Sequence, residues 1–363
     1  MTPKYLISAV CLVFFFLAPV QLFGASGYFR VEQKNGVWWF VSPSGQLLIS
    51  SGVNNVSYRR DVIRGTTDHP YFDHIQKLYP SQDAWAKVEI NRLRSWGFNN
   101  LGAWTTPFLW SYHMPYTVIL DIAARSGADW LKGLPLDVYS PQFEAIARQI
   151  AEKECAPRTQ DPDLLGYFSD NELRWGPDWR GKQNMLAMYL HLSSTTPGRQ
   201  HAIAFLKEKY ANSIQQLNQS WGTHATSFDD VPSEATTSAF QADNSQFLGM
   251  VARRYFEVCA HAIHDADPNH LYLGAKFAGT PPDPVLEASQ EADVVSVDIY
   301  NFDPRPIVGH IYKLAHRPIL VAEFAFRAEN SGLPNTQGAG PKVPHQAARA
   351  RLQKLRHRVG EPA

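Results

Sequence analysis

Leu164-Leu165-Gly166-Tyr167-Phe168-Ser169-Asp170-Asn171-Glu172 is the segment that most strongly constrains the fold of this chain. Its first six residues are apolar or small, and its last three are polar. A short apolar run that stops at polar residues is typical of a strand buried on both faces of a parallel sheet. Pro318-Ile319-Leu320-Val321-Ala322-Glu323 repeats the pattern. The two runs therefore predict parallel strands that each carry a glutamate at the carboxyl end.

Short apolar runs alternate with amphipathic helices on both sides of this segment. The expected strands are 47–53, 98–104, 117–122, 164–169, 271–277, 294–299 and 319–322, and the expected helices include 83–96, 141–150 and 246–266. This alternation predicts an α/β fold, a (β/α)8 barrel of the TIM type. We also expect an N-terminal β-hairpin at 36–53 and a helical insertion after strand four, at about 178–242.

An eighth strand is not recognisable in the sequence. After Glu323 the chain is rich in glycine and proline over 330–344, and it then becomes basic and helix-like over 346–358. We therefore expect one catalytic domain, 27–363, with an incomplete barrel: either the chain is truncated before the last strand, or the barrel is closed in a different way.

Residues 1–26 have the pattern of a secretory signal peptide. Lys4 precedes an uncharged run over 5–23, and the small residues 24–26 follow. This pattern predicts a secreted or periplasmic protein with no membrane contact after cleavage. A retained anchor is the alternative, because the run is long enough to span a bilayer if it is kinked at Pro19.

The composition excludes several other classes of protein. Lys and Arg together number 34, as do Asp and Glu, and this balance argues against binding to nucleic acid. A content of 44% hydrophobic and 19% charged residues predicts a folded chain. Beyond the leader only Cys155 and Cys259 remain, and no zinc motif occurs, so we predict no metal site and no cofactor. The sequence predicts no particular oligomeric state.

Two carboxylates at the carboxyl ends of strands suit the hydrolysis of a glycosidic bond. Catalytic residues of βα barrels project from these strand ends. A retaining glycosidase needs one carboxylic acid to protonate the leaving oxygen and one carboxylate to attack the anomeric carbon, roughly 5–5.5 Å apart. Glu172 would be the acid, with a raised pKa, and Glu323 the nucleophile. Asn171 could bind the sugar 2-hydroxyl, and Tyr300 could hold Glu323.

Four segments carry a resemblance to a known family. Their arrangement resembles clan A of the glycoside hydrolases, and more closely its β-agarase family 50, with some similarity to the β-galactosidases of the clan. The segments are Gly166–Glu172 with Trp175-Gly176, Leu217–Thr223, Asp267–Gly274 and Ser296–Tyr300.

The resemblance implies a (β/α)8 retaining enzyme without a cofactor. It implies acid/base catalysis by Glu172, nucleophilic attack by Glu323, contact with the sugar 2-hydroxyl by Asn171 and support of Glu323 by Tyr300. The implied additional sugar contacts are Trp104, Trp175 and Asn54.

Two departures from the family pattern affect the expected substrate. Lys276 stands near the end of strand five where an arginine is expected, and its side chain should either point into the site or bind a backbone carbonyl. Phe324 to Arg327 follow the nucleophile where the agarases more often have His and Gly. Three functions stay open: hydrolysis of an agarose-like galactan, hydrolysis of another β-linked sugar such as a β-galactoside or mannan, and sugar binding by an inactive fragment.

Overall fold

A computed structural model describes residues 26–63, 65–129, 132, 136–328 and 342–343. The expected signal peptide lies outside the described residues except for Ser26, and so does the expected basic helix at 346–358. Among the described residues, no helix is both long and apolar enough to cross a bilayer.

The chain enters the fold through a small antiparallel sheet. It contains β1 (Arg30–Lys34), β2 (Val37–Val41) and β3 (Leu47–Leu48). Asn35 and Gly36 join β1 to β2 with φ values of 52° and 78°, the left-handed pair that a tight hairpin turn requires. The hairpin expected at 36–53 is the next one along the chain, in which β2 pairs antiparallel with β3, and its second strand is shorter than predicted because β3 ends at Leu48.

Parallel strands follow in the order of the chain. Five of them form one sheet: β4 (Gly52–Val53), β5 (Asn100–Leu101), β6 (Tyr116–Ile119), β7 (Leu164–Phe168) and β8 (Leu271–Tyr272). Three more form a second sheet: β9 (Lys276–Ala278), β10 (Val295–Asp298) and β11 (Ile319–Glu323). All pairings within both sheets are parallel, as the sequence predicted.

The expected fifth strand is interrupted, so the prediction of one continuous strand over 271–277 was wrong. Gly274 breaks it between β8 and β9 with a φ of +75°, and an added Cβ there would lie 3.0 Å from the Val294 carbonyl oxygen. The two sheets stay connected because Asn171, just after β7, forms an isolated parallel bridge with Lys276. The chain therefore stays next to β7 on both sides of the break, first through β8 and then through the bridge to β9.

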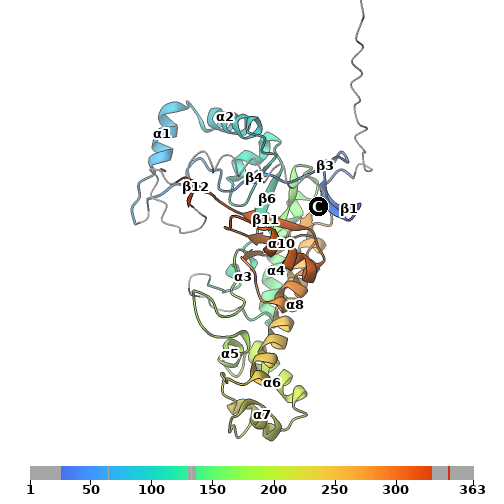
Figure 1. Ribbon diagram of the computed structural model, residues 1–363. Coiled ribbons are helices and arrows are strands. Elements are labelled where there is room, and N and C mark those ends of the chain that lie inside the picture. Colours follow the sequence, from blue (N-terminus) through green and yellow to red (C-terminus); the bar gives the residue numbers. More distant parts are fainter. Residues whose placement is uncertain (1–25, 64, 130–131, 133–135, 329–341, 344–363) are drawn as a thin grey trace, which may run out of the picture.

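Helices connect the strands and form a lobe of their own. They are α1 (Pro70–Leu78), α2 (Gln82–Ser95), α3 (Ile122–Arg125), α4 (Pro141–Glu154), α5 (Met185–Leu190), α6 (Pro197–Lys209), α7 (Ile214–Trp221), α8 (Ser238–Ala266), α9 (Asp283–Ala288) and α10 (Arg305–Ala315). Short 3-10 turns lie at Pro107–Tyr112, Ala156–Arg158, Phe228–Asp230 and Ser289–Glu291, and two short paired strands, β12 (Arg327–Ala328) and β13 (Lys342–Val343), come last. In Figure 1, α5, α6 and α7 lie away from the strands, and α8 runs from them back to the sheets.

Helix ends follow the sequence signals that predicted them. Ser140 caps α4 through its hydroxyl, which accepts from the Gln142 N–H at 3.2 Å, and Pro141 occupies the first helical position. The hydroxyl of Thr237 caps α8 in the same way. Helix α8 therefore begins at Ser238, eight residues before the start predicted at Gln246.

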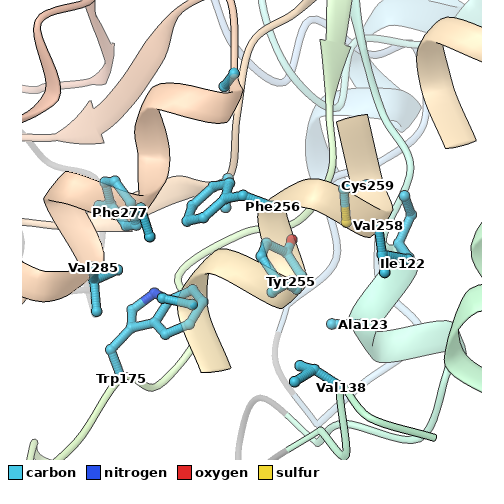
Figure 2. Packing of buried hydrophobic residues seen from close by; sticks show 14 of the residues in the cluster. Ile122, Ala123, Val138, Trp175, Tyr255, Phe256, Val258, Cys259, Phe277 and Val285 are labelled. Atoms are coloured by element: carbon cyan, nitrogen blue, oxygen red, sulfur yellow. The ribbon is translucent and has the colours of Figure 1, made fainter. Parts of the chain in front are cut away.

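The largest buried cluster packs α8 against the strands. Figure 2 shows Tyr255 and Phe256 of α8 beside Phe277 of β9 and Trp175, which follows β7. The Trp175 and Phe256 rings are stacked with centroids 6.0 Å apart. Aromatic side chains of this size contribute much of the burial that holds a helix on a sheet.

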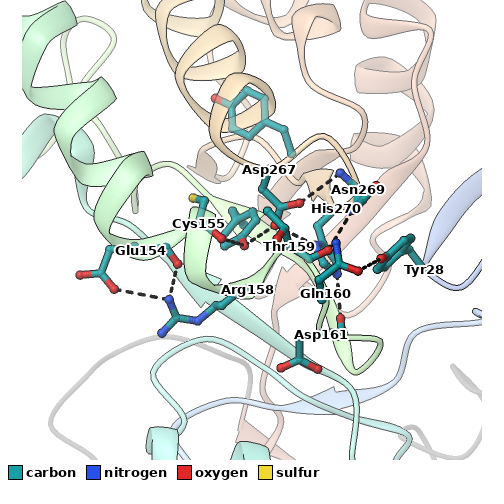
Figure 3. Close-up of polar contacts among 12 residues, drawn as sticks. Tyr28, Glu154, Cys155, Arg158, Thr159, Gln160, Asp161, Asp267, Asn269 and His270 are labelled. Atoms are coloured by element: carbon teal, nitrogen blue, oxygen red, sulfur yellow. Dashed lines mark hydrogen bonds and ion pairs between the residues drawn. The ribbon is translucent and has the colours of Figure 1, made fainter.

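A polar cluster closes the amino ends of β7 and β8. His270 lies between the Asp267 carboxylate, at 2.7 Å from Nδ1, and the Asp161 carbonyl oxygen, at 2.8 Å from Nε2. The Tyr167 hydroxyl donates to the same Asp267 carboxylate at 2.6 Å. Figure 3 shows how this amino-end cluster ties the end of α8 to the turn before β7.

The first and last parallel strands lie on either side of a cavity. Residues of β7 and β10 are all buried, whereas every residue of β11 is half-buried and Gly52 of β4 is exposed. A hollow of about 1920 Å³ lies between them, lined by apolar residues such as Phe40, Leu48 and Val321. Within the described residues β4 and β11 share no strand pairing, and the Asn54 side chain spans the distance by donating to the Ala322 carbonyl oxygen at 2.9 Å.

Candidate functional site

The carboxyl end of β7 carries a strained turn that places Glu172. Glu172 has a φ of 48°, a left-handed conformation that a non-glycine residue adopts at some cost, about 1–3 kcal/mol. Its N–H donates to the Lys276 carbonyl oxygen at 2.7 Å, and its carbonyl oxygen accepts from Arg180 at 2.8 Å. Backbone contacts on both sides therefore hold Glu172 in this conformation, a pattern found at functional sites.

Glu323 ends β11 within reach of two donors. The Tyr300 hydroxyl donates to one carboxylate oxygen, and the Lys276 ammonium donates to the other. The Glu323 side chain is 17% exposed. A carboxylate with charge-assisted bonds to both oxygens has a fixed orientation.

Lys276 connects the two glutamates. Its side chain is fully buried, and the Nζ atom donates to Asn171 Oδ1 at 2.8 Å and lies 3.4 Å from an oxygen of Asp298. The same Nζ lies 4.1 Å from the centroid of the Trp104 ring, in cation–π contact. The alternative in which Lys276 binds only a backbone carbonyl was therefore wrong: the side chain points into the site.

The pKa values of the acidic residues here are shifted upward. Burial raises the pKa of Glu172, and the nearby Glu323 charge raises it further, while Lys276 and Arg180 oppose the shift. Burial raises the pKa of Asp298 to about 8, although the Lys276 charge opposes it. Burial and the bond to Glu323 also raise the pKa of the Tyr300 hydroxyl, so it donates to Glu323 as a neutral phenol. Clustered acids with raised pKa values are typical of catalytic sites.

Asp170 supports the turn from beneath and was not predicted as a site residue. Its carboxylate is buried and accepts from the Ala123 N–H at 2.9 Å and from the Tyr255 hydroxyl at 2.7 Å. Burial raises the pKa of Asp170 to about 7, although the hydrogen bonds from Tyr255 and Ala123 lower it. The sequence signal was its place beside Asn171 and Glu172 at the strand end.

The structure brings most of the predicted site residues to one end of the sheets. The Lys276 ammonium contacts Asn171, Glu323 and Trp104. Tyr300 donates to Glu323, and the Glu172 N–H donates to the Lys276 carbonyl oxygen. Asn54 lies at the same end, bonded to β11 beside Glu323. Three of the predicted residues therefore surround one buried ammonium, and the others at this end reach them through Glu323, β11 or the backbone of Lys276.

Trp175 is the exception among the predicted sugar contacts. Its side chain is 8% exposed and lies in the main hydrophobic cluster against Tyr255, Phe256 and Phe277. Apolar packing under the turn explains a tryptophan at this position, so we correct the expectation that it contacts sugar.

The large cavity meets the site at its rim. Asn54, Phe302, Phe324 and Phe326 line it, whereas Glu172 and Glu323 are not among its lining residues. Phe302 and Phe324 are 53% and 44% exposed, and Phe302 stacks on Phe326. The sequence indicated no role for this aromatic rim. Across the described residues, no group of three His, Cys, Asp or Glu side chains is placed to hold a metal ion.

Known proteins are similar to this chain over most of its length. No family model matches. Beta-agarase A from Vibrio sp. (strain JT0107) is 27% identical over an alignment 370 residues long. The alignment covers 83% of this chain and 37% of that protein. The crystal structure of an agarase, AgWH50C, is 25% identical with a TM-score of 0.79 over 93% of this chain and 57% of that one. The chain resembles the β-agarases of glycoside hydrolase family 50.

The similarity of this β-agarase-like chain extends to a wider group at the level of fold. The β-galactosidase from the psychrophilic Marinomonas ef1 has a TM-score of 0.52 at 10% identity and covers 84% of the chain. The predicted likeness to clan A β-galactosidases is thus seen in the fold. The β-agarase-like chain spans about two-fifths of the length of the curated relatives that it matches.

Proposed function

We propose that this β-agarase-like chain is a retaining glycoside hydrolase that cleaves β-linked galactan of the agarose type. Glu172 is the acid/base residue and Glu323 is the nucleophile. The observation that carries the proposal is the bonding around Lys276, which joins the Glu323 carboxylate to Asn171, the residue next to Glu172.

In the first step, a Glu323 oxygen attacks the anomeric carbon and the glycosidic C–O bond breaks. The leaving oxygen takes the proton of Glu172, whose raised pKa keeps it protonated for this role. A covalent ester between the sugar and Glu323 results, and Glu172 becomes a carboxylate. The Tyr300 hydroxyl, bonded to the other Glu323 oxygen, orients the attack.

In the second step, Glu172 takes a proton from water as that water attacks the anomeric carbon. The ester bond breaks, Glu323 recovers its negative charge, and Glu172 is protonated again. The product keeps the anomeric configuration of the substrate because each of the two displacements inverts the configuration at the anomeric carbon. Each cycle needs only water and the two carboxylates.

The substrate class rests on the resemblance to proteins named as agarases. Asn171 would bind the sugar 2-hydroxyl, and Trp104 and Asn54, which lie at the same strand ends, would contact neighbouring parts of the sugar. We further infer an incomplete (β/α)8-type barrel over 27–363 with an insertion at about 178–242, which is supported by parallel strands in chain order. Secretion or a periplasmic location after loss of 1–26 completes the proposal.

The test is turnover of agarose oligosaccharides and of an aryl β-galactoside by the purified chain. We expect agarose oligosaccharides to be cleaved with retention of configuration, seen by proton NMR of the first product, and no cleavage by Glu323→Ala. An inverted product would refute double displacement. Cleavage of the aryl galactoside alone would favour a β-galactosidase, and binding without turnover by a folded chain would favour an inactive sugar-binding protein.

A further inference from the structure

Lys276 contacts both the turn after β7 and the end of β11, through its backbone and its side chain. Its N–H donates to the Asp170 carbonyl oxygen at 3.0 Å, and its carbonyl oxygen accepts from the Glu172 N–H at 2.7 Å. Its ammonium group donates to Asn171 and Glu323. One residue of β9 thus determines the position of the β7 turn and of the end of β11.

A buried ammonium is costly unless it is paired and hydrogen-bonded. The acceptors are Asn171 and Glu323, and Asp298 lies 3.4 Å away. The face of the Trp104 ring adds a favourable contact at 4.1 Å. Of these partners only Glu323 lies at the end of β11, and it is partly exposed, so the ammonium is aimed at the carboxylate that must react.

We propose that Lys276 is a positioning residue that keeps Glu323 ionised and orients the Asn171 amide so that its NH2 group faces the substrate. This inference rests on the proposed function, since it assigns Glu323 as nucleophile. Lysine carries only donors, so the Asn171 atom that faces it must be the oxygen. The amide nitrogen is then left to donate to a sugar hydroxyl.

The same ammonium balances the charge throughout the reaction. Before attack the negative charge is on Glu323, and after formation of the ester it is on Glu172. The Lys276 ammonium acts on both groups, since it bonds to Glu323 and its charge favours ionisation of Glu172 as well. A fixed charge that needs no rearrangement during the reaction is the form of electrostatic stabilisation that enzymes use most.

Asp298 is a potential competitor for the ammonium. Its side chain is fully buried, and neither carboxylate oxygen has a hydrogen-bond partner. Burial raises the pKa of Asp298, which favours its uncharged form and leaves Lys276 to Glu323. The other titratable groups near Glu323 and Lys276 are Glu172, Tyr300 and Asp121.

The test compares Lys276→Met and Lys276→Gln, which remove the charge, with Lys276→Arg, which keeps it. Carbon-13 NMR of labelled glutamate side chains follows the pH midpoint at which the Glu323 carboxyl protonates, with its signal assigned by its loss in Glu323→Gln. We expect the midpoint to rise by about one pH unit or more in the Met and Gln variants and to change little in the Arg variant. The acid limb of kcat/KM should move with it.

An unchanged midpoint in a folded Met or Gln variant overturns the inference. A purely structural role would lower kcat at all pH values without moving the acid limb. If Lys276→Met fails to fold, Lys276→Gln keeps a donor for Asn171 and still lacks the charge. Glu287→Ala, at an exposed position of α9, serves as a control that leaves the midpoint in place. Because the NMR readout needs no turnover, an inactive wild-type chain would refute the proposed function without deciding the role of Lys276.

Discussion

The amino and carboxyl ends of the parallel strands each carry a buried polar cluster, and the two clusters differ in how fully they are satisfied. At the amino ends, Asp267 accepts from both His270 and Tyr167. At the carboxyl ends, the Asp298 oxygens have no hydrogen-bond partner, and Glu172 occupies a left-handed backbone conformation.

The pKa directions of the acids follow this difference. Burial opposes ionisation of Asp267, but the bonds from His270 and Tyr167 outweigh it and lower the pKa of Asp267. Burial dominates at Glu172 and Asp298 and raises their pKa values. Satisfied polar groups stabilise a fold, whereas acids held against their ionised form are available for proton transfer. The amino-end cluster therefore contributes to stability, and the carboxyl-end cluster has the properties that the proposed chemistry needs.

The largest expected effect is the loss of activity in Glu323→Ala. We expect kcat to fall about 10⁴-fold or more, because no other group can form the ester. The melting temperature should fall, because the buried Lys276 ammonium loses its charged partner. Kinetic assays and calorimetry measure the two effects. Glu287→Ala, an exposed glutamate on α9, is the control and should change neither.

The second expected effect is a loss of stability without a loss of activity, at the amino ends of the strands. We expect Asp267→Asn to lower the free energy of unfolding by about 2–4 kcal/mol, because it weakens a buried bonded pair, while kcat of the folded protein stays unchanged. Urea unfolding at several pH values is the measurement. The lowered pKa means that the contribution of Asp267 is present at neutral pH and is lost as the pH falls below about 4. A loss of kcat equal to that of a site variant would contradict the division between the ends.

A third experiment examines the carboxyl end alone. Because the Glu323 charge contributes to the raised pKa of Glu172, Glu323→Gln should lower the pKa of Glu172 by about one unit. Carbon-13 NMR titration measures this value directly. In the active protein, the raised pKa of Glu172 places loss of activity at the alkaline limb of the pH profile. If the pKa of Glu172 does not move, the two carboxylates are too far apart to act on one bond.

The smallest effect is expected for Tyr300→Phe. Loss of one neutral donor to Glu323 should lower kcat by about tenfold and leave KM nearly unchanged, because the bond orients the nucleophile and does not bind sugar. Steady-state kinetics at the pH optimum measure it. A change confined to KM would assign Tyr300 to substrate binding.

Patterns of apolar residues were enough to predict the strands and their carboxylates. Glu172 and Glu323 were found because each ends an apolar run. The break at Gly274 was missed because Lys276 is the one charged residue in an otherwise apolar or small run over 271–277. Trp175 was misplaced because a turn residue can face the sugar side or the core, and only packing against Phe256 decides. Lys276 stayed open since its partners come from β7, β10 and β11, which lie far from it in the sequence.

The half-burial of β11 has a consequence for how this protein would lose activity on heating. Within the described residues β11 is paired with β10 alone, and Glu323 is its last residue. Strands with few buried contacts open at a lower free energy than the rest of a fold. Opening of this strand would withdraw the nucleophile while helices such as α8 remain folded. Thermal inactivation would then be a local event that precedes the loss of helical circular dichroism, and hydrogen exchange would locate its start at Ile319–Glu323.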